Sequence, residues 1–338
     1  MKGKIMLCVL LFLIMFFIPF LSVGAKIPDK TGAAQQQKTQ LQSSTGQQQN
    51  AIPQAQAKSA FRILDTSSGK TITVDDRTFL YGAIASEMSP TAPAEALKAQ
   101  GVAAYTYYSR AREKKEASAP KEAHFTADTQ KWQIYVTKEQ MQERWGSNFD
   151  AYYGKLDSAV SAIYGQVLKS DGELIDATYY AISSGRTETS EDIWGGKRSY
   201  LVSVASPGDV FSGGYQTTAV LTADQFKAAV QKAVPKANLG EDAKTWVGAS
   251  KRTDSGSVES IVIGGETVTG NAARSIFDLR SANFTVAYSG GSFTFTVKGY
   301  GHGVGMSQAG AEYMANQGMT YRQILSWYYP TTTLTSVN

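Results

Sequence analysis

A single acidic residue at the end of an apolar segment is the first candidate for chemistry in this sequence. Glu87 follows Ala83-Ile84-Ala85-Ser86 and precedes Met88-Ser89-Pro90. A carboxyl group held against apolar neighbours has its charged form disfavoured, which raises its pKa towards neutrality. Such a group can donate a proton and then take one back, as a general acid and base must. The alternative is a partly exposed Glu that merely ends a helix.

A second candidate is the segment Gly299-Tyr300-Gly301-His302-Gly303-Val304-Gly305-Met306-Ser307-Gln308. Its alternating glycines allow positive φ and close approach of the backbone to a ligand. The helix expected next offers free N–H groups for an oxyanion or for sugar oxygens. A phosphate-binding P-loop is excluded because Gly-Lys-Ser/Thr is missing. The alternative is a glycine-rich turn in which His302 makes packing hydrogen bonds.

A third candidate runs from two aromatic residues into a polar loop, Tyr179-Tyr180-Ala181-Ile182-Ser183-Ser184-Gly185-Arg186-Thr187-Glu188. Proteins bind sugars in this way, with rings stacked on aromatic side chains and hydroxyl groups held by polar ones. An ordinary solvated loop remains the alternative.

Other chemistries have little support. The chain has two histidines, His124 and His302, and its single cysteine, Cys8, lies in an apolar N-terminal run. A catalytic zinc site usually needs three protein ligands, so we predict no metal and no other cofactor. A Ser-His-Asp hydrolase would use His302, but the G-x-S-x-G elbow is absent. The net charge of +4 is too small, without a basic stripe, to indicate nucleic-acid binding.

The N-terminus predicts export. Lys2 and Lys4 precede an apolar run over residues 5–23, the layout of a secretory signal that is nearly long enough to span a bilayer. We favour an uncleaved signal anchor over residues 1–25, which would make this a single-pass cell-membrane protein with an extracytoplasmic domain. Cleavage near Val23-Gly24-Ala25 is the alternative. Residues 26–59 are rich in Gln, Ser and Thr and predict a flexible linker, with a helical stalk as the competitor.

The elements that position these candidates are expected within one domain over residues 60–335. A helix over 80–87 carries Glu87, and Pro93 can begin a second helix that runs to about Lys115. Further helices are expected at 138–145, 150–166, from the capping box Thr222/Gln225 to about 234, and at 307–317 and 321–329. Strands are expected at 61–64, 71–74, 167–169, 174–181, 258–263, 266–269, 284–288 and 293–298, with Asp171-Gly172 as a tight turn. Helices and strands come in mixed order, so the predicted class is α+β, with helices and β-hairpins around one substrate cleft.

Together the three candidate segments resemble the family of stage II sporulation protein D, whose relatives include the amidase enhancer of vegetative bacilli. The likeness covers roughly residues 60 to 335. Three signatures carry it, and they are Glu87-Met88 followed by Glu95-Ala96-Leu97-Lys98-Ala99-Gln100-Gly101-Val102-Ala103-Ala104, Ser183-Ser184-Gly185 with Thr187-Glu188, and Gly301-His302-Gly303-Val304-Gly305-Met306-Ser307-Gln308.

The resemblance implies a lytic transglycosylase of peptidoglycan, a carbon–oxygen lyase, with Glu87 at the catalytic position. Its substrate would be MurNAc–GlcNAc strands stripped of stem peptides, cut to 1,6-anhydro-MurNAc products during engulfment in sporulation. Its partners would be an amidase or endopeptidase and a third membrane protein. Hydrolases need two carboxylates, whereas here the sugar's own C6 hydroxyl can attack, so one suffices. The residues that we expect to hold the sugar are Tyr180, Ser184, Glu188, His302 and Gln308.

Two departures from the family pattern bear on this expectation. Family members usually have Arg where Tyr105 stands, so we expect Arg110 or Arg186 to substitute for it, or the activity to differ. Some members hold zinc through a Cys/His cluster after the second helix. That region here keeps only His124, with Asp128 and Trp132 nearby, so we predict no zinc.

Two rival functions remain open on the sequence. The chain could be a non-catalytic wall-binding protein that enhances an amidase, as the name of one relative and the missing Arg indicate. It could also be a hydrolytic muramidase, which requires a second carboxylate such as Glu188 or Asp192 close to Glu87.

Overall fold

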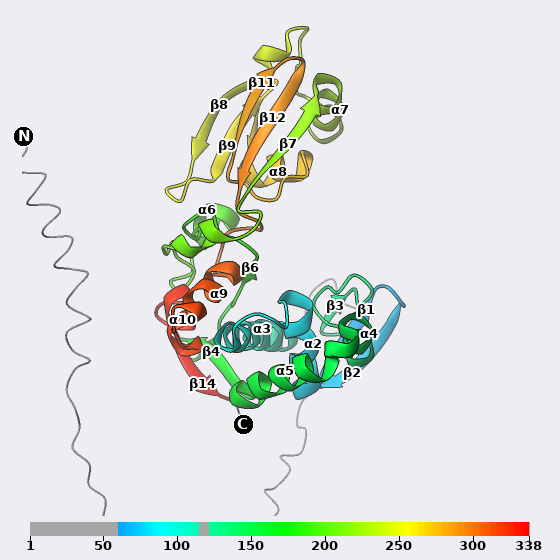
Figure 1. Ribbon diagram of the computed structural model, residues 1–338. Helices are drawn as coiled ribbons and strands as arrows, with labels where there is room; N and C mark the ends of the chain where they lie inside the picture. The colour runs from blue at the N-terminus through cyan, green and yellow to red at the C-terminus, as the bar shows by residue number, and fades with distance from the viewer. Residues whose placement is uncertain (1–59, 115–121, 338) are drawn as a thin grey trace, which may run out of the picture. The chain divides into compact units, whose positions relative to one another are not determined.

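The structure is a computed structural model that describes residues 60–114 and 122–337 (Figure 1). The expected signal anchor at 1–25 and the expected linker at 26–59 lie outside the described residues. Within the described ranges, no helix is both long enough and apolar enough to cross a membrane. Helices alternate with several small sheets, so the described part of the chain is a mixed α and β structure, as the predicted class requires.

Two consecutive helices, α2 (Asp76–Glu87) and α3 (Ala94–Lys114), place the candidate carboxyl group (Figure 1). The side chain of Asp75 caps α2 by accepting a hydrogen bond from the backbone N–H of Thr78 at 3.0 Å. The helix ends at Glu87 because Met88 is extended, with φ −130° and ψ 150°. Glu87 therefore stands at the last turn of a helix whose preceding residues are buried.

Close helix packing surrounds α3. A Cβ at Gly101 would lie 2.3 Å from Ile163 Cδ1, so glycine at this position permits the approach of α5 (Phe149–Ile163). Helix α4 (Lys138–Trp145) begins at a capping box formed by Thr137 and Gln140, with the predicted bounds. Two late helices, α9 (Gln308–Asn316) and α10 (Tyr321–Tyr328), also pack on α3.

Small sheets flank these helices. In the first sheet, β1 (Ala60–Asp65) pairs antiparallel with β2 (Lys70–Asp75) and parallel with β3 (Phe125–Ala127). In the second, β4 (Gln166–Ser170) lies between β14 (Thr333–Ser336) and β5 (Glu173–Leu174). The predicted turn at Asp171-Gly172 is confirmed, with φ of 52° and 82°.

The predicted strand over 174–181 is wrong in its extent. The hairpin strand β5 stops at Leu174, and only Tyr179–Tyr180 form a further strand, β6. Strand β6 pairs in parallel with β13 (Met306–Ser307), inside the glycine-rich segment. This partner lies far along the chain, so local alternation could not reveal the break. The expected loop after it contains a short helix, α6 (Ser190–Trp194), and the 3-10 turn η3 (Pro207–Phe211) follows.

A second hydrophobic core lies between two three-stranded sheets and two helices. One sheet has the order β11 (Phe284–Ser289), β12 (Ser292–Lys298), β7 (Gln216–Thr222), and the other the order β10 (Glu266–Thr269), β9 (Val258–Ile263), β8 (Val247–Arg252). The helices are α7 (Ala223–Ala233) and α8 (Gly270–Ile276). Phe226 of α7 stacks on Phe293 with ring centroids 3.9 Å apart. The strands β7 and β8 were not predicted because both are mostly polar and exposed.

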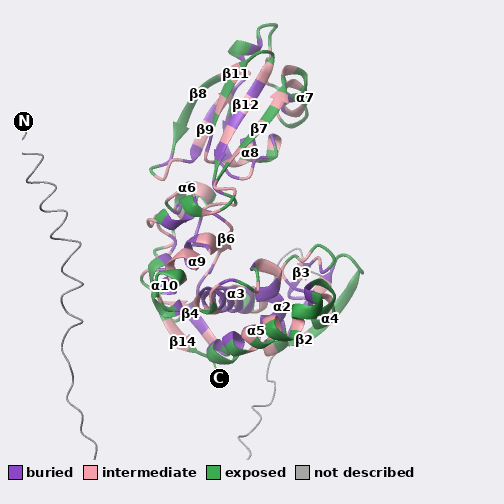
Figure 2. Cartoon of the chain, in the orientation of Figure 1, coloured by how far each residue is buried: buried purple, intermediate pink, exposed green. Residues whose placement is uncertain are grey.

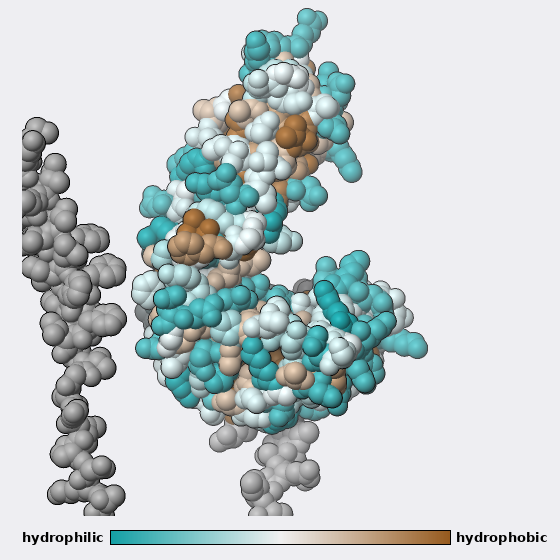
Figure 3. All heavy atoms as spheres, viewed as in Figure 1, coloured by the Kyte–Doolittle hydropathy of each residue, from teal (hydrophilic) through white to brown (hydrophobic). Residues whose placement is uncertain are grey.

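The buried residues form two separate clusters, one around α2 and α3 and one around Phe226. Figure 2 shows buried residues concentrated along α3 and on the strands β9 and β12, whereas helices such as α4 are exposed on one side. The face drawn in Figure 3 is mostly hydrophilic, with small apolar areas. Glu87 lies at the end of a helix of the first cluster. The loop over residues 183–188 after β6, which we call the serine loop, is followed along the chain by the residues of the second cluster.

Candidate active site

Glu87 is half-buried, and its carboxylate is held by a side chain from the far end of the chain. The Nε2 group of Gln308 donates a hydrogen bond to Glu87 Oε2 over 3.2 Å. Burial raises the pKa of Glu87 above its ordinary value of 4.5, and the hydrogen bond from Gln308 offsets this only in part. The pKa of the carboxyl group is therefore shifted in the direction that a proton donor needs.

Glu87 lines two cavities. The first, which we call the tyrosine cavity, has a volume of about 220 Å³, and the second, the tryptophan cavity, about 470 Å³. The tyrosine cavity is lined by Glu87, Tyr107, Tyr108, Thr178, Tyr179 and His302. The tryptophan cavity is lined by residues 85–91 together with Trp132, Arg144, Trp145 and Tyr152. Among the described residues, Glu87 alone lines both cavities, and it is the one carboxylate in either lining.

Gln308 is positioned from two sides. It is the first residue of α9, whose N-cap Ser307 accepts a hydrogen bond from the backbone of Gly310 at 3.2 Å. Its Nε2 group also lies 3.4 Å from Oε1 of Gln100, a fully buried residue of α3. One amide thus joins α2, α3 and α9 at the carboxyl group.

A fully buried carboxylate, Asp209, fixes the start of α9. It accepts hydrogen bonds from the backbone of Ser183 at 2.6 Å, from Ser206 Oγ at 2.5 Å and from Ser307 Oγ. Burial raises its pKa, and these hydrogen bonds offset the rise only in part. Sequence reasoning missed Asp209 because nothing in its local segment marks it. Its role is to tie the serine loop to the helix that carries Gln308.

His302 lines the tyrosine cavity with both ring nitrogens already engaged. Its Nδ1 accepts from the backbone N–H of Val304 at 3.1 Å, and its Nε2 lies 3.1 Å from the carbonyl oxygen of Tyr179. Burial lowers the pKa of His302 to about 4, so the ring is neutral with the proton on Nε2. Its ring also packs against Trp194, with centroids 5.3 Å apart. His302 therefore shapes the cavity wall and offers no free nitrogen for proton transfer.

The two adjacent tyrosines of β6 face opposite ways, as strand geometry requires. Tyr179 lines the tyrosine cavity, and its hydroxyl contacts that of Tyr108. Tyr180, which we expected to hold the sugar, is 5% exposed and packs under the glycine-rich segment instead. A Cβ at Gly301 would lie 2.6 Å from Tyr180 Cβ. Glycine at position 301 thus allows the backbone of the glycine-rich segment to pack closely against the side chain of Tyr180.

Ser184 and Glu188 lie outside the linings of both Glu87 cavities. Ser184 lines a different cavity, of about 420 Å³, near strands of the second core. Glu188 is buried and accepts a hydrogen bond from the backbone of Ser257 at 3.3 Å, and burial raises its pKa. Asp192 accepts from Thr189 Oγ1 at 2.7 Å at the start of α6. The structure therefore brings together Glu87, Gln308 and His302, and leaves Ser184 and Glu188 elsewhere.

Comparison with known proteins shows which family the chain belongs to. A family model described as Stage II sporulation protein matches residues 65–169. Stage II sporulation protein D of Bacillus amyloliquefaciens is 37% identical, over 78% of this chain and 75% of that protein. Its counterpart in Bacillus subtilis (strain 168) is 34% identical, over 77% and 74%. The chain belongs to the stage II sporulation protein D family. The amidase enhancer of Bacillus subtilis (strain 168) is 29% identical, over 76% of this chain and 40% of that protein.

As a member of the stage II sporulation protein D family, the chain is a sporulation protein. Tyr105, which stands where family members usually have Arg, contacts the first residue of α2. Tyr105 donates a hydrogen bond to Asp76 Oδ2 at 2.7 Å, and Arg112, two helical turns further along α3, reaches Asp76 Oδ1 at 2.8 Å. Asp76 is the first residue of α2 and Glu87 the last. Tyr105 and Arg112 thus both contact the end of α2 that is remote from Glu87, and the expectation for Arg110 or Arg186 stays a prediction.

The segment in which some members of the stage II sporulation protein D family hold zinc has other contacts here. His124 Nδ1 accepts a hydrogen bond from the backbone of Arg62 at 3.2 Å. Asp128 pairs with Lys131 at 2.9 Å. Within the described ranges, no three His, Cys, Asp or Glu side chains gather as a metal site.

Proposed function

We propose that this protein is a lytic transglycosylase that cuts the glycan strands of peptidoglycan, with Glu87 as both acid and base. The observation that carries the proposal is that one half-buried carboxyl group, with a raised pKa, lines two cavities. A chain-like substrate that occupies both cavities would cross Glu87. Membership of a sporulation family supports a cell-wall substrate.

The chemistry needs only this one carboxyl group. Protonated Glu87 gives its proton to the oxygen that bridges C1 of N-acetylmuramic acid and C4 of N-acetylglucosamine, and the bond from C1 to that oxygen breaks. The resulting carboxylate takes the proton of the muramic acid's C6 hydroxyl, whose oxygen bonds to C1 and closes a 1,6-anhydro ring. Glu87 regains its proton and no water is consumed. Because the attack is intramolecular, it gains from proximity.

The walls of the cavities fit sugars. Three tyrosines line the tyrosine cavity, and Trp132, Trp145 and Tyr152 line the tryptophan cavity. Aromatic faces of this kind pack against the apolar faces of sugar rings, while their polar atoms meet hydroxyl groups. A hydrolytic muramidase is less well supported, because Glu188 and Asp192, its candidate second carboxylates, line neither cavity.

Digestion of stem-peptide-free glycan strands by the full-length protein tests the reaction class. Mass spectrometry should find 1,6-anhydro-MurNAc ends among the products. Products that carry only ordinary reducing ends would reject the transglycosylase and favour a hydrolase. Strands that stay intact at every pH tested would reject both.

A non-catalytic role is the second candidate, because one relative carries the name amidase enhancer. In that case the protein would bind glycan and stimulate a partner amidase without cutting. Stimulation of an amidase that survives unchanged in Glu87→Gln, together with absence of cutting by the wild type, would support this role. Loss of cutting in Glu87→Gln, with wild-type cutting present, would favour the enzyme.

The cellular setting proposed here follows from the N-terminal sequence and the family. We propose that residues 1–25 anchor the protein in the cell membrane, with the described domain outside the cytoplasm. It would act in engulfment beside an amidase or endopeptidase and another membrane protein. Protease treatment of intact protoplasts should remove the domain and leave a membrane-bound N-terminal fragment. Full protection of the domain would contradict this topology.

A further inference from the structure

Arg144 is an exposed cation in the wall of the tryptophan cavity, and the proposed reaction does not use it. Its guanidinium carbon lies 4.2 Å from the ring centroid of Trp132, which lines the same cavity. A guanidinium stacked on an indole keeps its N–H groups pointing outward at the ring edge, where they can form paired hydrogen bonds with a carboxylate.

No carboxylate of the described residues is within ion-pair distance of Arg144. Three and four residues before Arg144, on α4, are Met141 and Gln140, and three and four residues after it, in the 3-10 turn Gly146–Asn148, are Ser147 and Asn148. None of these positions offers an acidic partner. In the loop between β3 and α4, residues 128–137, which we call the Trp132 loop, the carboxylate of Asp128 is already paired with Lys131. Arg144 is thus a cation whose charge the described part of the protein leaves uncompensated.

The aromatic partner of Arg144 is held in an unusual backbone conformation. Trp132 has φ of +56°, and Ile134 has φ of +72°. Positive φ is costly for large side chains, so the surrounding contacts must hold this loop in its conformation. The backbone conformation thus restricts where the indole ring of Trp132 can lie.

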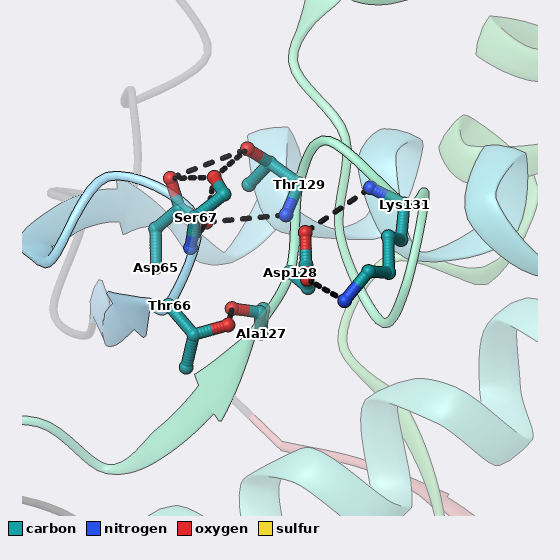
Figure 4. A network of polar contacts seen from close by, with 7 residues as sticks. All are labelled: Asp65, Thr66, Ser67, Ala127, Asp128, Thr129 and Lys131. Carbon is teal, nitrogen blue, oxygen red and sulfur yellow. Dashed lines mark hydrogen bonds and ion pairs between the residues drawn. The ribbon is translucent and has the colours of Figure 1, made fainter.

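A polar network, drawn in Figure 4, fixes the loop that carries Trp132. Asp65, at the end of β1, accepts from the backbone of Thr129 at 3.1 Å and from its hydroxyl at 3.3 Å. The carbonyl oxygen of Thr129 in turn accepts from the backbone N–H of Trp132 at 3.3 Å and from Gln140 Nε2 of α4 at 3.2 Å. The network joins the loop to the helix that bears Arg144, so the stacked pair is preorganised.

We propose that the stacked Arg144–Trp132 pair recognises the free lactyl carboxylate of a muramic acid residue bound in the tryptophan cavity. In intact peptidoglycan that carboxyl group is bound in an amide to the stem peptide and carries no charge. Removal of the peptide exposes an anion on the sugar, for which a stacked guanidinium is a fitting partner. The pair would therefore select stem-peptide-free strands. This inference rests on the proposed glycan substrate.

Arg144 and Glu87 line the same tryptophan cavity, and Arg144 does not lower the pKa of Glu87. Among the described residues no cation is within ion-pair distance of Glu87, and burial and Gln308 account for its pKa. A guanidinium in contact with Glu87 would lower that pKa and weaken the proton donor. Arg144 thus makes no ion pair with Glu87, so it is available to a substrate anion while the acid keeps its raised pKa.

The test combines a protein variant with a chemically altered ligand. Binding is measured by calorimetry with full-length Glu87→Gln protein, so that no turnover occurs, against denuded glycan strands and against the same strands with the lactyl carboxylates converted to methylamides. Adding Arg144→Gln should weaken binding to the native strands about tenfold or more. Methylamidation should weaken binding to a similar extent, and the two changes together should cost little more than either alone.

Controls separate this role from general packing. Arg322 also stacks on a ring, 5.0 Å from the centroid of Tyr321, but lines neither cavity, so Arg322→Gln should bind native strands normally. Arg144→Lys, which keeps the charge and loses the planar fork, should be intermediate. Equal losses for native and methylamidated strands in Arg144→Gln would overturn the proposal, as would unchanged binding. Recognition measured in this way stands even if the wild type cuts nothing, so failure of the proposed reaction is seen separately.

Discussion

The side-chain amide of Gln308 donates a hydrogen bond to the carboxylate of Glu87 across 221 residues of sequence, with 3.2 Å between Nε2 and Oε2. This hydrogen bond joins the end of α2 to the glycine-rich segment 299–308, two of the three segments that the sequence marks as candidates for chemistry. It also opposes the effect of burial, because a donor to the carboxylate favours the charged form. The pKa of Glu87 is therefore set by a balance that one substitution can shift.

Replacing Gln308 by Leu should move the pH dependence of cutting. The rate should fall as the pH rises through the pKa of Glu87, because the protonated form is the acid. Loss of the Gln308 donor should raise that pKa further, so this limb should shift to higher pH. Rate profiles for the wild type and the variant measure the shift. Gln231→Leu, an exposed change on α7, should leave the limb in place, and an unmoved limb in Gln308→Leu would contradict this role.

Glu87→Gln should make the folded protein more stable at pH 7. The folded-state pKa of Glu87 lies above its ordinary value of 4.5, so ionisation costs stability as the pH rises from about 4.5 to the raised pKa. Below that window both folded and unfolded states are protonated, and the gain should vanish. Thermal melts across pH would detect this trend, with the exposed Glu143→Gln as a flat control. A variant less stable than the wild type at pH 7 would argue against a desolvated carboxylate.

Gly305→Ala should unfold or inactivate the protein through a backbone collision. Its φ is +84°, and a Cβ would lie 2.0 Å from the carbonyl oxygen of Thr178, a residue of the tyrosine cavity. Gly265 has the same φ of +84° but no atom within 4 Å, so Gly265→Ala isolates the cost of the backbone conformation, about 1 kcal/mol. Unfolding in denaturant should show a larger loss for Gly305→Ala. Equal losses would mean that the contact with Thr178 is unimportant.

Asp65→Asn should loosen the Trp132 loop in a pH-dependent way. Burial raises the pKa of Asp65, but hydrogen bonds from Ser68, Ser67 and Thr129 outweigh it and bring the pKa to about 2. A depressed pKa means that Asp65 contributes stability above its ordinary value of 3.8, and that this is lost as the pH falls towards about 2. The stability difference between wild type and variant should shrink over that window. A difference that is constant with pH would contradict the proposed network.

Much of the fold could be predicted because its signals are local. The capping box of Thr222 and Gln225 marks the start of α7, and hydrophobic patterning gave β9 and β10 with their observed bounds. Strands β7 and β8 escaped prediction because few of their side chains are buried. These two strands are held in their sheets by pairing with neighbouring strands that lie elsewhere in the sequence, so a short stretch of sequence does not reveal them.

The candidate site was predicted only where chemistry is visible in residue type. Glu87, His302 and Gln308 stand out by residue type and lie close together. The sequence does not distinguish Tyr180 from Tyr179, because two adjacent residues of a strand cannot be assigned to faces without knowing the partner strand. Arg144 showed no local signal. It lies on the exposed face of α4, and only the structure shows that it stacks on Trp132 of the Trp132 loop.

The most direct test of the central claim is digestion of denuded glycan strands in water enriched in the heavy oxygen isotope. Wild type, Glu87→Gln and Glu312→Gln are compared by mass spectrometry of the new ends. Glu312 is a matched control, because burial also raises its pKa although it lines neither Glu87 cavity. We predict unlabelled anhydro ends from the wild type and Glu312→Gln, and no cutting by Glu87→Gln. Labelled ends, or undiminished cutting by Glu87→Gln, would contradict the account.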